Sequence, residues 1–379
     1  MFKKLEQFSK EELSGKKVFL RVDFNIPLTQ LPTSSFRLTE TYRIKAHKET
    51  IDFLLSAGAK VGLVSHINDS FKNITEEIGI ILGHQLNFEE DILNPKLDSP
   101  LTLFENIRKY EGEEINDSGF AEDLAKNFDI YVNDAFSVSH RNHASVSAIT
   151  KFLLSYAGFL MEKELSNLEK VLNAPAQGKI IILGGAKIST KIPVIRNFLD
   201  KAGHILIAGA LANAVFKFKG LAVGRSTADD SEATEVLKQT DWDDSKILLP
   251  KDIVVLEDPE GTLKVLPVQN LEDNQMILDI GPETAKQFSE IIKKSKTVIF
   301  NGPLGLAEVE AFSAGTKIVL DSIIRSGAFS VIGGGDTLAL VEKLNLTDSF
   351  GFVSTGGGAM LEFLAGNKLP GLEALGYYG

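Results

Sequence analysis

The stretch "FSVIGGGDT" (residues 329–337) runs a short apolar segment into three glycines and an acidic residue. Such an apolar run is typical of a β-strand that is buried on both faces, as the strands of parallel sheets are. The glycines predict a tight turn, and the aspartate after them is a residue type that often begins a helix as its N-cap. The stretch therefore predicts a strand, a turn and a helix, the repeating unit of a doubly wound α/β sheet.

The same unit recurs along the chain in two series. Further apolar runs that lead into a turn cover residues 16–26, 59–67, 99–107 and 128–136 in the first half, and 179–187, 204–212, 295–303 and 349–358 in the second. A chain of 379 residues is long enough for two domains of the usual size. We therefore expect an α/β protein with two doubly wound parallel-sheet (Rossmann-like) domains, joined by a helix and with a cleft between them.

The segment 156–179 carries the expected domain boundary. Its middle has the pattern of one helix, and "NAPAQG" after it is a helix stop signal. We place the N-terminal domain at residues 1–160 and the C-terminal domain at residues 161–365. The charged, turn-rich stretch 221–262 is expected to be a peripheral excursion of the second domain.

Composition narrows the class of protein. The formal net charge of −11 argues against a nucleic-acid partner or an anionic membrane surface, because both require a basic face. The absence of cysteine excludes disulfides, thiolate metal sites and cysteine nucleophiles. The charged start of the sequence has no apolar core of a signal peptide, and no run of about 18 apolar residues occurs. We expect a cytoplasmic protein.

Five glycine-bearing turns of the second half predict a phosphate-binding edge: "LGGAK", "AGALA", "NGPLG", "GGGD" and "TGGGA". Ligands bind beyond the carboxyl ends of parallel strands, where glycines let backbone N–H groups approach them. Neither the Walker-type loop nor the dinucleotide fingerprint occurs. Lys187 and Lys191 supply positive charge after one turn, although two lysines on a solvated helix are also common. Asp336 is either a helix cap or, beside a polyphosphate, a ligand of Mg²⁺.

Arginines of the first half predict a second anion site. Eight of the forty cationic side chains are arginine, and Arg21, Arg37, Arg43, Arg108 and Arg141 lie within the first 150 residues. Arginine binds carboxylate and phosphate through two parallel hydrogen bonds, so a group of them favours a small, multiply charged anion over isolated surface salt bridges. His66 and His140 follow similar strand ends.

Asp23 and Asn25 also lie at the end of a predicted strand. Their oxygens would either bind substrate hydroxyls or serve only to cap the turn. The sequence contains no evident nucleophilic dyad, HExxH motif or carboxylate pair. The pattern therefore favours direct phosphoryl transfer, which depends on positioning and charge stabilisation. A two-domain dehydrogenase is the alternative from the fold alone.

The chain resembles the phosphoglycerate kinase family. The motifs that carry the resemblance span residues 16 to 375 in the family's order: "RVDFNIPL", "YRIKA", "ENIR", "YVNDAFSVSHRNHAS", "AGFLMEKEL", "ILGGAKISTKI", "LDIGPET", "NGPLGLAE", "VIGGGDT" and "VSTGGGAMLEFLAGNKLPGLEAL". The resemblance implies a monomeric, hinge-bending glycolytic kinase with a carboxyl group as acceptor. It would transfer phosphate reversibly between 1,3-bisphosphoglycerate and ADP, with Mg²⁺, giving 3-phosphoglycerate and ATP. The tail, residues 366–379, would pack back onto the N-terminal domain.

The resemblance also implies roles for particular residues. The expected contacts of the phosphoglycerate are Asp23, Asn25, Arg43, His66, Arg108 and Arg141. The expected contacts of the nucleotide are Gly184, Gly185, Lys187, Lys191, Gly209, Asn301, Pro303, Glu308, Gly334, Gly335, Asp336, Thr337, Gly356, Gly357 and Gly358. Arg43, Lys187, Lys191 and Gly357 are expected to act in catalysis, and Asp336 is the expected metal ligand.

The chain departs from the family's pattern at several points. Asp69 stands where the family usually has an arginine, and Lys72 nearby is a possible substitute. The nucleoside turns carry Ala208, Ala210 and Ala307, Thr190 replaces an aspartate, and residues 28–40 contain a loop insertion. Because of these departures, the sequence does not determine which nucleotide base the protein prefers. They also support an alternative function, that of a catalytically weakened phosphoglycerate-kinase-like nucleotide-binding protein.

Overall fold

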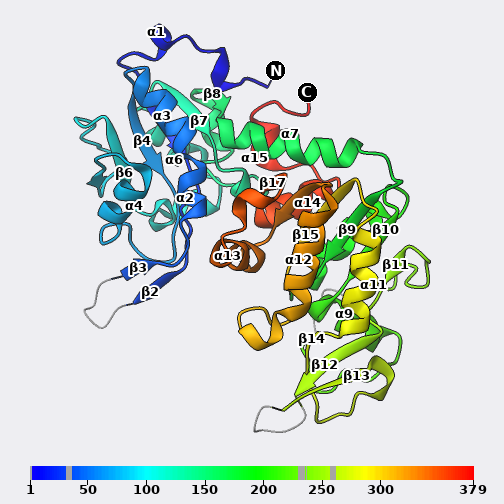
Figure 1. The fold of residues 1–379 in the computed structure, drawn as a ribbon. Coiled ribbons are helices and arrows are strands. Elements are labelled where there is room, and N and C mark those ends of the chain that lie inside the picture. The colour runs from blue at the N-terminus through cyan, green and yellow to red at the C-terminus, as the bar shows by residue number, and fades with distance from the viewer. Residues whose placement is uncertain (1, 31–35, 229–234, 236, 257–261) are drawn as a thin grey trace. The chain divides into compact units, whose positions relative to one another are not determined.

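The computed structural model describes residues 2–30, 36–228, 235, 237–256 and 262–379 (Figure 1). The chain divides into two compact units, which we call unit 1 (Met1–Ser166 with Lys368–Gly379) and unit 2 (Asn167–Asn367). Each unit contains one six-stranded sheet whose neighbouring strands are all parallel. The predicted pair of parallel-sheet α/β domains is confirmed.

The sheet of unit 1 has the strand order β5-β6-β4-β1-β7-β8. Its strands are β1 (Lys17–Arg21), β4 (Lys60–Val64), β5 (Asn87–Glu89), β6 (Leu101–Phe104), β7 (Ile130–Asn133) and β8 (Leu154–Ala157). The helices around it are α1 (Lys10–Leu13), α2 (Tyr42–Ala46), α3 (Lys48–Ser56), α4 (Thr75–Leu82), α5 (Glu111–Glu114) and α6 (Ser118–Ala125). The sequence predicted the four central strands and missed the two edge strands.

Alternation along β1 explains why this sheet is covered on both faces. Val18 and Leu20 point into an aliphatic core with Leu54 of α3 and Ile78 of α4, and all four are fully buried. Phe19 points to the opposite face, where its ring contacts the rings of Phe128 and Tyr131 at 5.2 and 5.6 Å. Burying such side chains contributes about 1.5–3 kcal/mol each, which favours a strand without a solvent face.

A small antiparallel hairpin, β2 (Leu28–Gln30) and β3 (Phe36–Leu38), projects from unit 1. It lies within the loop insertion predicted at residues 28–40. Residues 31–35 of that insertion lie outside the described residues.

The sheet of unit 2 has the order β11-β10-β9-β15-β16-β17. Its strands are β9 (Lys179–Leu183), β10 (His204–Ile207), β11 (Ile247–Leu248), β15 (Thr297–Asn301), β16 (Phe329–Gly333) and β17 (Phe352–Val353). Its helices are α8 (Ile188–Phe198), α9 (Gly209–Phe218), α11 (Pro282–Ile292), α12 (Ala314–Ser326), α13 (Gly335–Lys343) and α14 (Gly357–Leu364). A second, antiparallel sheet of β12 (Asp252–Leu256), β13 (Leu263–Pro267) and β14 (Ile277–Ile280) begins within the predicted excursion.

Helix α7 (Phe159–Asn173) runs from unit 1 into unit 2 and corresponds to the helix predicted within 156–179. The backbone N–H of Leu160 donates to Asp134 Oδ1 at 2.9 Å, so a carboxylate caps the start of the helix. Gly158 precedes the helix because a Cβ there would lie 2.2 Å from that same oxygen. Pro175 follows the helix end by two residues and cannot continue it.

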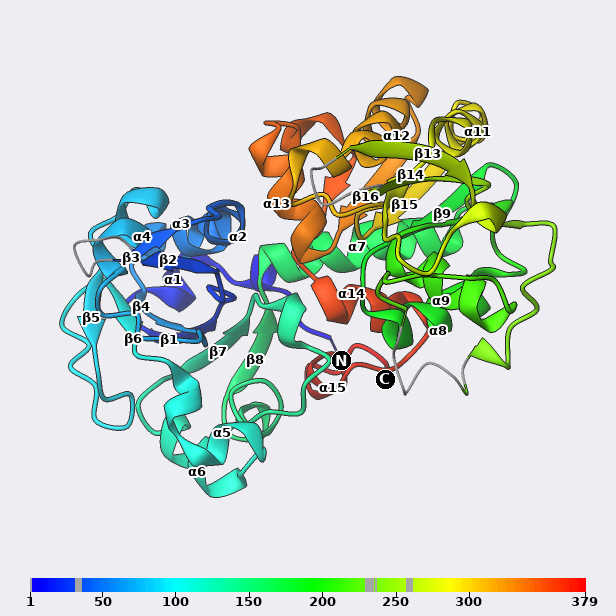
Figure 2. The same cartoon turned by 90° about the horizontal axis from the view of Figure 1, so that it is seen from below.

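The C-terminal residues belong to unit 1, in which both chain ends lie close together (Figure 2). Gly371 N, in α15 (Pro370–Ala374), donates to Ser139 O at 2.8 Å. The ring of Tyr377 meets the ring of Phe2 edge-on at 5.4 Å. In the part of the chain that the structure describes, no helix has the length and apolarity needed to cross a membrane.

Candidate active site

Asp23 lies just beyond the carboxyl end of β1 and is almost fully buried. Its Oδ2 accepts a hydrogen bond from Ser137 Oγ at 2.6 Å, and its Oδ1 accepts one from Asn25 N at 3.1 Å. Burial alone would raise the pKa of this carboxyl, but the positive charge of Arg43 and these hydrogen bonds lower it below its usual value. Asp23 is therefore a fixed carboxylate, able to accept hydrogen bonds from hydroxyl groups.

Arg43, on α2, lies against the same turn. Its Nη1 donates to Asn25 O at 3.0 Å and lies 3.8 Å from Asp23 Oδ2. Its Nε lies 3.2 Å from Glu40 Oε1. The structure thus brings Asp23, Asn25 and Arg43 together, with the side chain of Arg43 only 16% exposed.

Four cationic or polar side chains, Arg21, His66, Arg108 and Arg141, form what we call the arginine cluster. Burial, followed by the charge of Arg21 and then those of Arg108 and Arg141, lowers the pKa of His66 to about 3, partly offset by Asp23. Burial and the charge of Arg141 likewise lower the pKa of Arg108. These mutual effects require the four groups to be close neighbours, since charge effects fall off with distance.

The arginine cluster is only partly neutralised. Arg108 Nε lies 3.2 Å from Glu114 Oε1, and Arg21 is bound through Ser145, whose Oγ donates to Glu113 Oε1 at 2.6 Å. Arg141 forms no salt bridge within the described ranges. Buried Arg108 Nη2 and His66 Nδ1 lack a hydrogen-bond partner among the described residues. Buried polar atoms are normally paired, so these atoms mark a place for a ligand or water.

Arg21 was named among the arginines of the first half but not among the expected contacts. It is the deeply buried member of the cluster, with 1% of its surface exposed. The chain departs from the family's pattern at Asp69, with Lys72 as the possible substitute, and these two residues lie in different places. Asp69 is exposed, and its backbone O accepts a hydrogen bond from Asn106, two residues before Arg108. Lys72 instead lines a hollow between α4 and β5 with Glu76 and His84.

In unit 2 the turns after β9, β10, β15, β16 and β17 share one edge, because all the strands are parallel. We call these turns the glycine edge. Backbone hydrogen bonds join them: Gly185 N donates to Pro303 O at 2.7 Å, and Gly209 N donates to Leu304 O at 3.1 Å. The predicted edge is therefore one continuous backbone surface.

Glycine is needed at this edge for two different physical reasons. A Cβ on Gly184 would lie 2.1 Å from Pro303 O, and one on Gly209 would lie 2.8 Å from Gly185 N. These two glycines allow turns to pack against each other. Gly357 begins α14 with a φ of +50°, and a Cβ there would meet nothing within 4 Å. Gly357 therefore faces open space in unit 2, as a backbone group that meets a ligand must.

The neighbouring glycines also include some that pack against other groups and some that are exposed. Gly334 has a φ of +99° and lies against the Asn301 side chain, while Gly335 and Gly358 are exposed within the first turns of α13 and α14. Gly356 is buried, and its N–H donates to Ser354 Oγ at 3.0 Å.

Two lysines and one aspartate gather at the turn after β9. Lys187 is exposed at the N-cap of α8, whereas Lys191 is only 5% exposed and its Nζ donates to Lys187 O at 3.3 Å. Burial lowers the pKa of Lys191 to about 8, and the charge of Lys187 adds to this, while the charge of Asp336 opposes it. Asp336 is exposed in the first turn of α13.

Two further predicted residues lie behind this edge. Thr337 is fully buried, and its Oγ1 accepts a hydrogen bond from Gly302 N at 3.0 Å. Asn301 ends β15 and is 3% exposed, and its Nδ2 has no hydrogen-bond partner within the described ranges. An unpaired amide donor at the glycine edge suits an anionic ligand.

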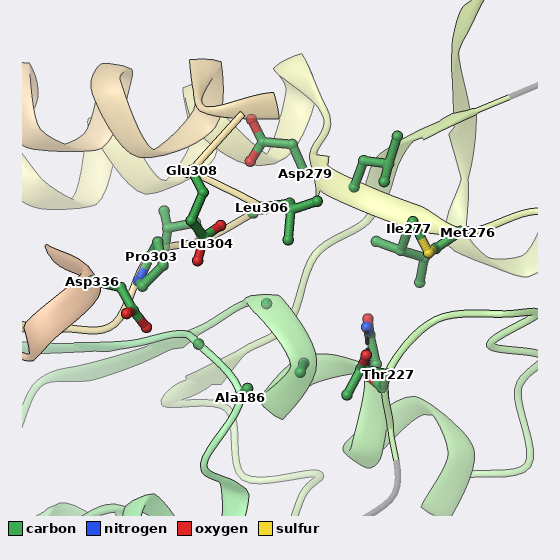
Figure 3. Close-up of a pocket in the computed structure, with 16 residues that line it drawn as sticks. Ala186, Thr227, Met276, Ile277, Asp279, Pro303, Leu304, Leu306, Glu308 and Asp336 are labelled. Atoms are coloured by element: carbon green, nitrogen blue, oxygen red, sulfur yellow. Dashed lines mark hydrogen bonds between the residues drawn. The ribbon is translucent and has the colours of Figure 1, made fainter. Parts of the chain in front are cut away.

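A cavity of about 160 Å³ opens beside the glycine edge (Figure 3). Pro303, Leu306 and Ile277 are among its apolar walls, and Asp336 and Glu308 bring carboxylates to one side. Small-molecule sites usually measure about 300–1,000 Å³, so this cavity would enclose only part of a nucleotide. Of the three alanines at which the chain departs from the family's pattern, Ala210 lines the cavity, whereas Ala208 and Ala307 are buried.

Asn213, Thr227 and Asp279 also line the cavity, although none of them is among the residues predicted from the sequence. Of the three, Asp279 lies in a motif of the family resemblance, "LDIGPET", and could have been predicted from it. Its oxygens accept hydrogen bonds from Ile280 N at 2.8 Å and Gly315 N at 2.7 Å. Burial nevertheless raises the pKa of Asp279 to about 6, because these hydrogen bonds only partly oppose it. Asn213 Nδ2 donates to Thr227 O at 3.1 Å, which leaves its oxygen available to a ligand.

Within the described residues, no group of three or more histidine, aspartate or glutamate side chains is arranged to hold a metal ion. Asp336 alone presents an exposed carboxylate beside Lys187 and Lys191. One carboxylate fits Mg²⁺ of the kind that is held mainly by substrate phosphates and water, and it does not fit a metal bound by the protein alone.

Comparisons with known proteins agree with one another. The family model described as phosphoglycerate kinase matches residues 8–367. The phosphoglycerate kinase of Moorella thermoacetica is 39% identical, with 96% of this chain and 97% of that protein covered. The phosphoglycerate kinase of Herpetosiphon aurantiacus is 42% identical, with 96% of each covered.

Solved structures of phosphoglycerate kinases are also similar. The enzyme from Pyrococcus horikoshii has a TM-score of 0.87 at 31% identity and covers 99% of this chain and 98% of its own. The one from Coxiella burnetii has a TM-score of 0.82 at 30% identity and covers 100% of this chain and 99% of its own. Sequence and structure thus match over nearly the full length, and the chain belongs to the phosphoglycerate kinase family.

Proposed function

We propose that this chain is a glycolytic kinase that transfers a phosphoryl group reversibly between 1,3-bisphosphoglycerate and ADP, giving 3-phosphoglycerate and ATP. The acceptor in the reverse direction is the carboxylate of 3-phosphoglycerate. Family membership over residues 8–367 supports this proposal, and the family gives no support to the dehydrogenase alternative. We further propose that the protein acts as a monomer in the cytoplasm.

The N-terminal domain binds 3-phosphoglycerate in this proposal. Arg108 and Arg141 hold its phosphate and carboxylate, because guanidinium groups bind both through paired hydrogen bonds. His66 is neutral near pH 7, since its pKa lies near 3, so it contributes a hydrogen bond and no charge. Asp23 and the side chain of Asn25 bind the hydroxyl group, and Arg43 provides positive charge for the reacting carboxylate.

The C-terminal domain binds the nucleotide. The cavity of about 160 Å³ receives the base, with Pro303 against the ring and Glu308 toward the ribose. The phosphates lie along the glycine edge, where the backbone at Gly334, Gly335, Gly357 and Gly358 faces the ligand and the helices α13 and α14 begin, while Gly356, whose N–H is bonded to Ser354 Oγ, shapes the turn before α14. Gly184, Gly185 and Gly209 shape this edge, and Asn301 and Thr337 support it.

Asp336 would hold Mg²⁺ together with the bound nucleotide, and the ion would neutralise negative charge on the oxygens of the transferred group. Lys187 and Lys191 hold the same phosphates as point charges. Lys187 is exposed and free to follow the transferred group, whereas buried Lys191 is fixed by its bond to Lys187 O.

Transfer is direct, because neither half-site offers a nucleophile to carry the phosphoryl group. The attacking oxygen, the phosphorus and the leaving oxygen must lie nearly in line, so the bound acid and the bound nucleotide must meet. Excluding water at that moment would protect the acyl phosphate from hydrolysis and strengthen the arginine and lysine charges.

The observation that most supports the proposal is the excess positive charge around His66. A coupled assay for ATP formation from 1,3-bisphosphoglycerate and Mg-ADP tests it. Robust turnover is expected. Nucleotide binding without turnover would instead indicate the catalytically weakened homologue. A rate of ATP formation that does not depend on 1,3-bisphosphoglycerate would reject the assigned substrate.

A further inference from the structure

His47 occupies a buried position between the turn at Asp23 and the start of α7. It lies between α2 and α3 and is 1% exposed. Its Nε2 accepts a hydrogen bond from the backbone N–H of Asp23 at 3.0 Å, and its Nδ1 lies 2.8 Å from Asp134 Oδ2. The ring also meets Phe24 edge-on at 5.7 Å between centroids.

The two hydrogen bonds determine the tautomer of the imidazole. A backbone N–H can only donate, so Nε2 must be the acceptor and the ring proton must lie on Nδ1. Nδ1 then donates to the Asp134 carboxylate, which is fully buried. Both ring nitrogens are thus used for structure, and neither is available to exchange a proton with a substrate.

Asp134 continues the connection to α7. Its second oxygen, Oδ1, accepts from Leu160 N at 2.9 Å, and the neighbouring Phe159 N donates to Thr50 Oγ1 at 3.0 Å. Thr50 is one turn after His47, and Arg43 is one turn before it. The segment of α2 and α3 therefore joins the Asp23–Asn25 turn to the first residues of α7 through short polar contacts.

We propose that His47 is a positioning residue for the acid substrate: it fixes the backbone at Asp23 and ties this turn to Asp134, the carboxylate that caps α7. The proposal rests on the proposed function, because it assumes that Asp23 and Asn25 contact 3-phosphoglycerate. It adds a residue that touches no substrate but sets the position of two that do.

Two isosteric substitutions separate the two bonds. In His47→Asn the amide nitrogen overlays Nδ1, so it keeps the donor to Asp134 but loses the acceptor for Asp23 N–H. In His47→Gln the amide oxygen reaches the position of Nε2, so it keeps that acceptor but loses the donor to Asp134. His84→Asn and His84→Gln are matched controls, because His84 is partly exposed in the same unit and its ring bonds to Asp52 at the surface.

We expect His47→Asn to raise KM for 3-phosphoglycerate about five- to tenfold, the equivalent of one hydrogen bond, with KM for ATP within about twofold. Amide hydrogen exchange of residues 22–26 should accelerate. His47→Gln should leave this KM within about twofold and accelerate exchange in residues 159–162 instead. Both His84 variants should match the wild type.

Unchanged KM and unchanged exchange in His47→Asn would overturn the proposal. It would also be overturned if both His47 variants raised KM equally and in step with a fall in Tm, since that is the result of a packing role. A wild-type protein that fails to bind 3-phosphoglycerate would reject the proposed function itself, while the exchange pattern would still decide whether His47 holds the two segments.

Discussion

The arginine cluster of unit 1 consists of side chains, whereas the glycine edge of unit 2 consists mainly of backbone. In unit 1 the proposed substrate contacts come from separate elements, and protein groups hold some of them, as Asn25 O holds Arg43 Nη1 at 3.0 Å. In unit 2 the turns support one another, as Gly185 N and Pro303 O do at 2.7 Å. Side-chain substitution should therefore affect binding in unit 1, while in unit 2 backbone geometry and the two lysines should matter most.

The sharpest test of this contrast pairs Lys187→Ala with Arg141→Ala. Lys187→Ala should lower kcat about 10²- to 10³-fold, because its charge is matched to the transferred group in the transition state. Arg141→Ala should mainly raise KM for 3-phosphoglycerate, by roughly 10- to 100-fold, because it removes a ground-state anion contact. Steady-state kinetics with both substrates varied measures the two effects.

Surface variants provide the controls for this pair. Lys126 and Arg325 are exposed cations in side-chain ion pairs with Asp123 and Asp321. Their alanine variants should have wild-type kinetics, because exposed ion pairs contribute little. Wild-type kinetics in Lys187→Ala and Arg141→Ala would show that the site residues are wrongly assigned.

Gly357→Ala and Gly327→Ala test whether the glycine edge works through its backbone. Both glycines have positive φ, +50° and +67°, and in both a Cβ would meet nothing within 4 Å. Each substitution should cost about 1–2 kcal/mol of folding free energy from backbone strain alone. Only Gly357→Ala should also lower kcat, by about tenfold, because its methyl group would occupy the ligand side. Thermal unfolding and kinetics together check this, and equal activity in both variants would contradict it.

The two half-sites should also differ in their response to pH. Lys191 has a pKa lowered to about 8, so it is charged below that pH and loses its charge as pH rises through 8. Affinity for nucleotide should therefore fall several-fold between pH 7 and 9. His66, with a pKa near 3, stays neutral from pH 5.5 to 7.5, so it should add no pH dependence to 3-phosphoglycerate binding there.

Calorimetric titrations at each pH measure these affinities. Lys191→Arg is the informative variant, because a guanidinium stays charged throughout this range. Its affinity for nucleotide should fall less between pH 7 and 9 than that of the wild type. A wild-type nucleotide affinity that stays constant to pH 9 would contradict the assignment of Lys191 as a phosphate clamp.

Asp69→Arg should give the smallest effect. It restores the charge that the family usually has at the margin of the arginine cluster, but the position is exposed and screened by salt. KM for 3-phosphoglycerate should fall about two- to threefold at low ionic strength, and less at high ionic strength. Asp98→Arg makes the same change in net charge near the amino end of β6, away from the site, and should leave KM unchanged.

The sequence predicted the elements with strong local patterns. All nine apolar runs became strands, and α7 formed where a helix and its stop signal were expected. The edge strands β5, β8 and β11 were missed, because each has only two to four residues and is partly exposed. The glycine turns could be predicted too, but their two purposes could not. Only the structure shows that Gly184 makes room for Pro303 O and that Gly357 faces open space.

Long-range contacts explain the rest of what was missed. His47 and Asp134 are 87 residues apart, and neither belongs to a local motif that would pair them. Asp279 and Asn213 reach one cavity from separate elements, so their shared location depends on sheet order. The low pKa of His66 likewise follows from burial and from three arginines on other segments, which local sequence does not reveal.

The most direct test of two separate half-sites is calorimetric titration of the wild type, Arg141→Ala and Lys187→Ala with 3-phosphoglycerate alone and with Mg-ADP alone. We expect one site per chain for each ligand in the wild type, with Arg141→Ala weakened only toward the acid and Lys187→Ala retaining the wild-type affinity for the acid. Loss of nucleotide binding in Arg141→Ala with acid binding intact, or no acid binding by the wild type, would contradict it.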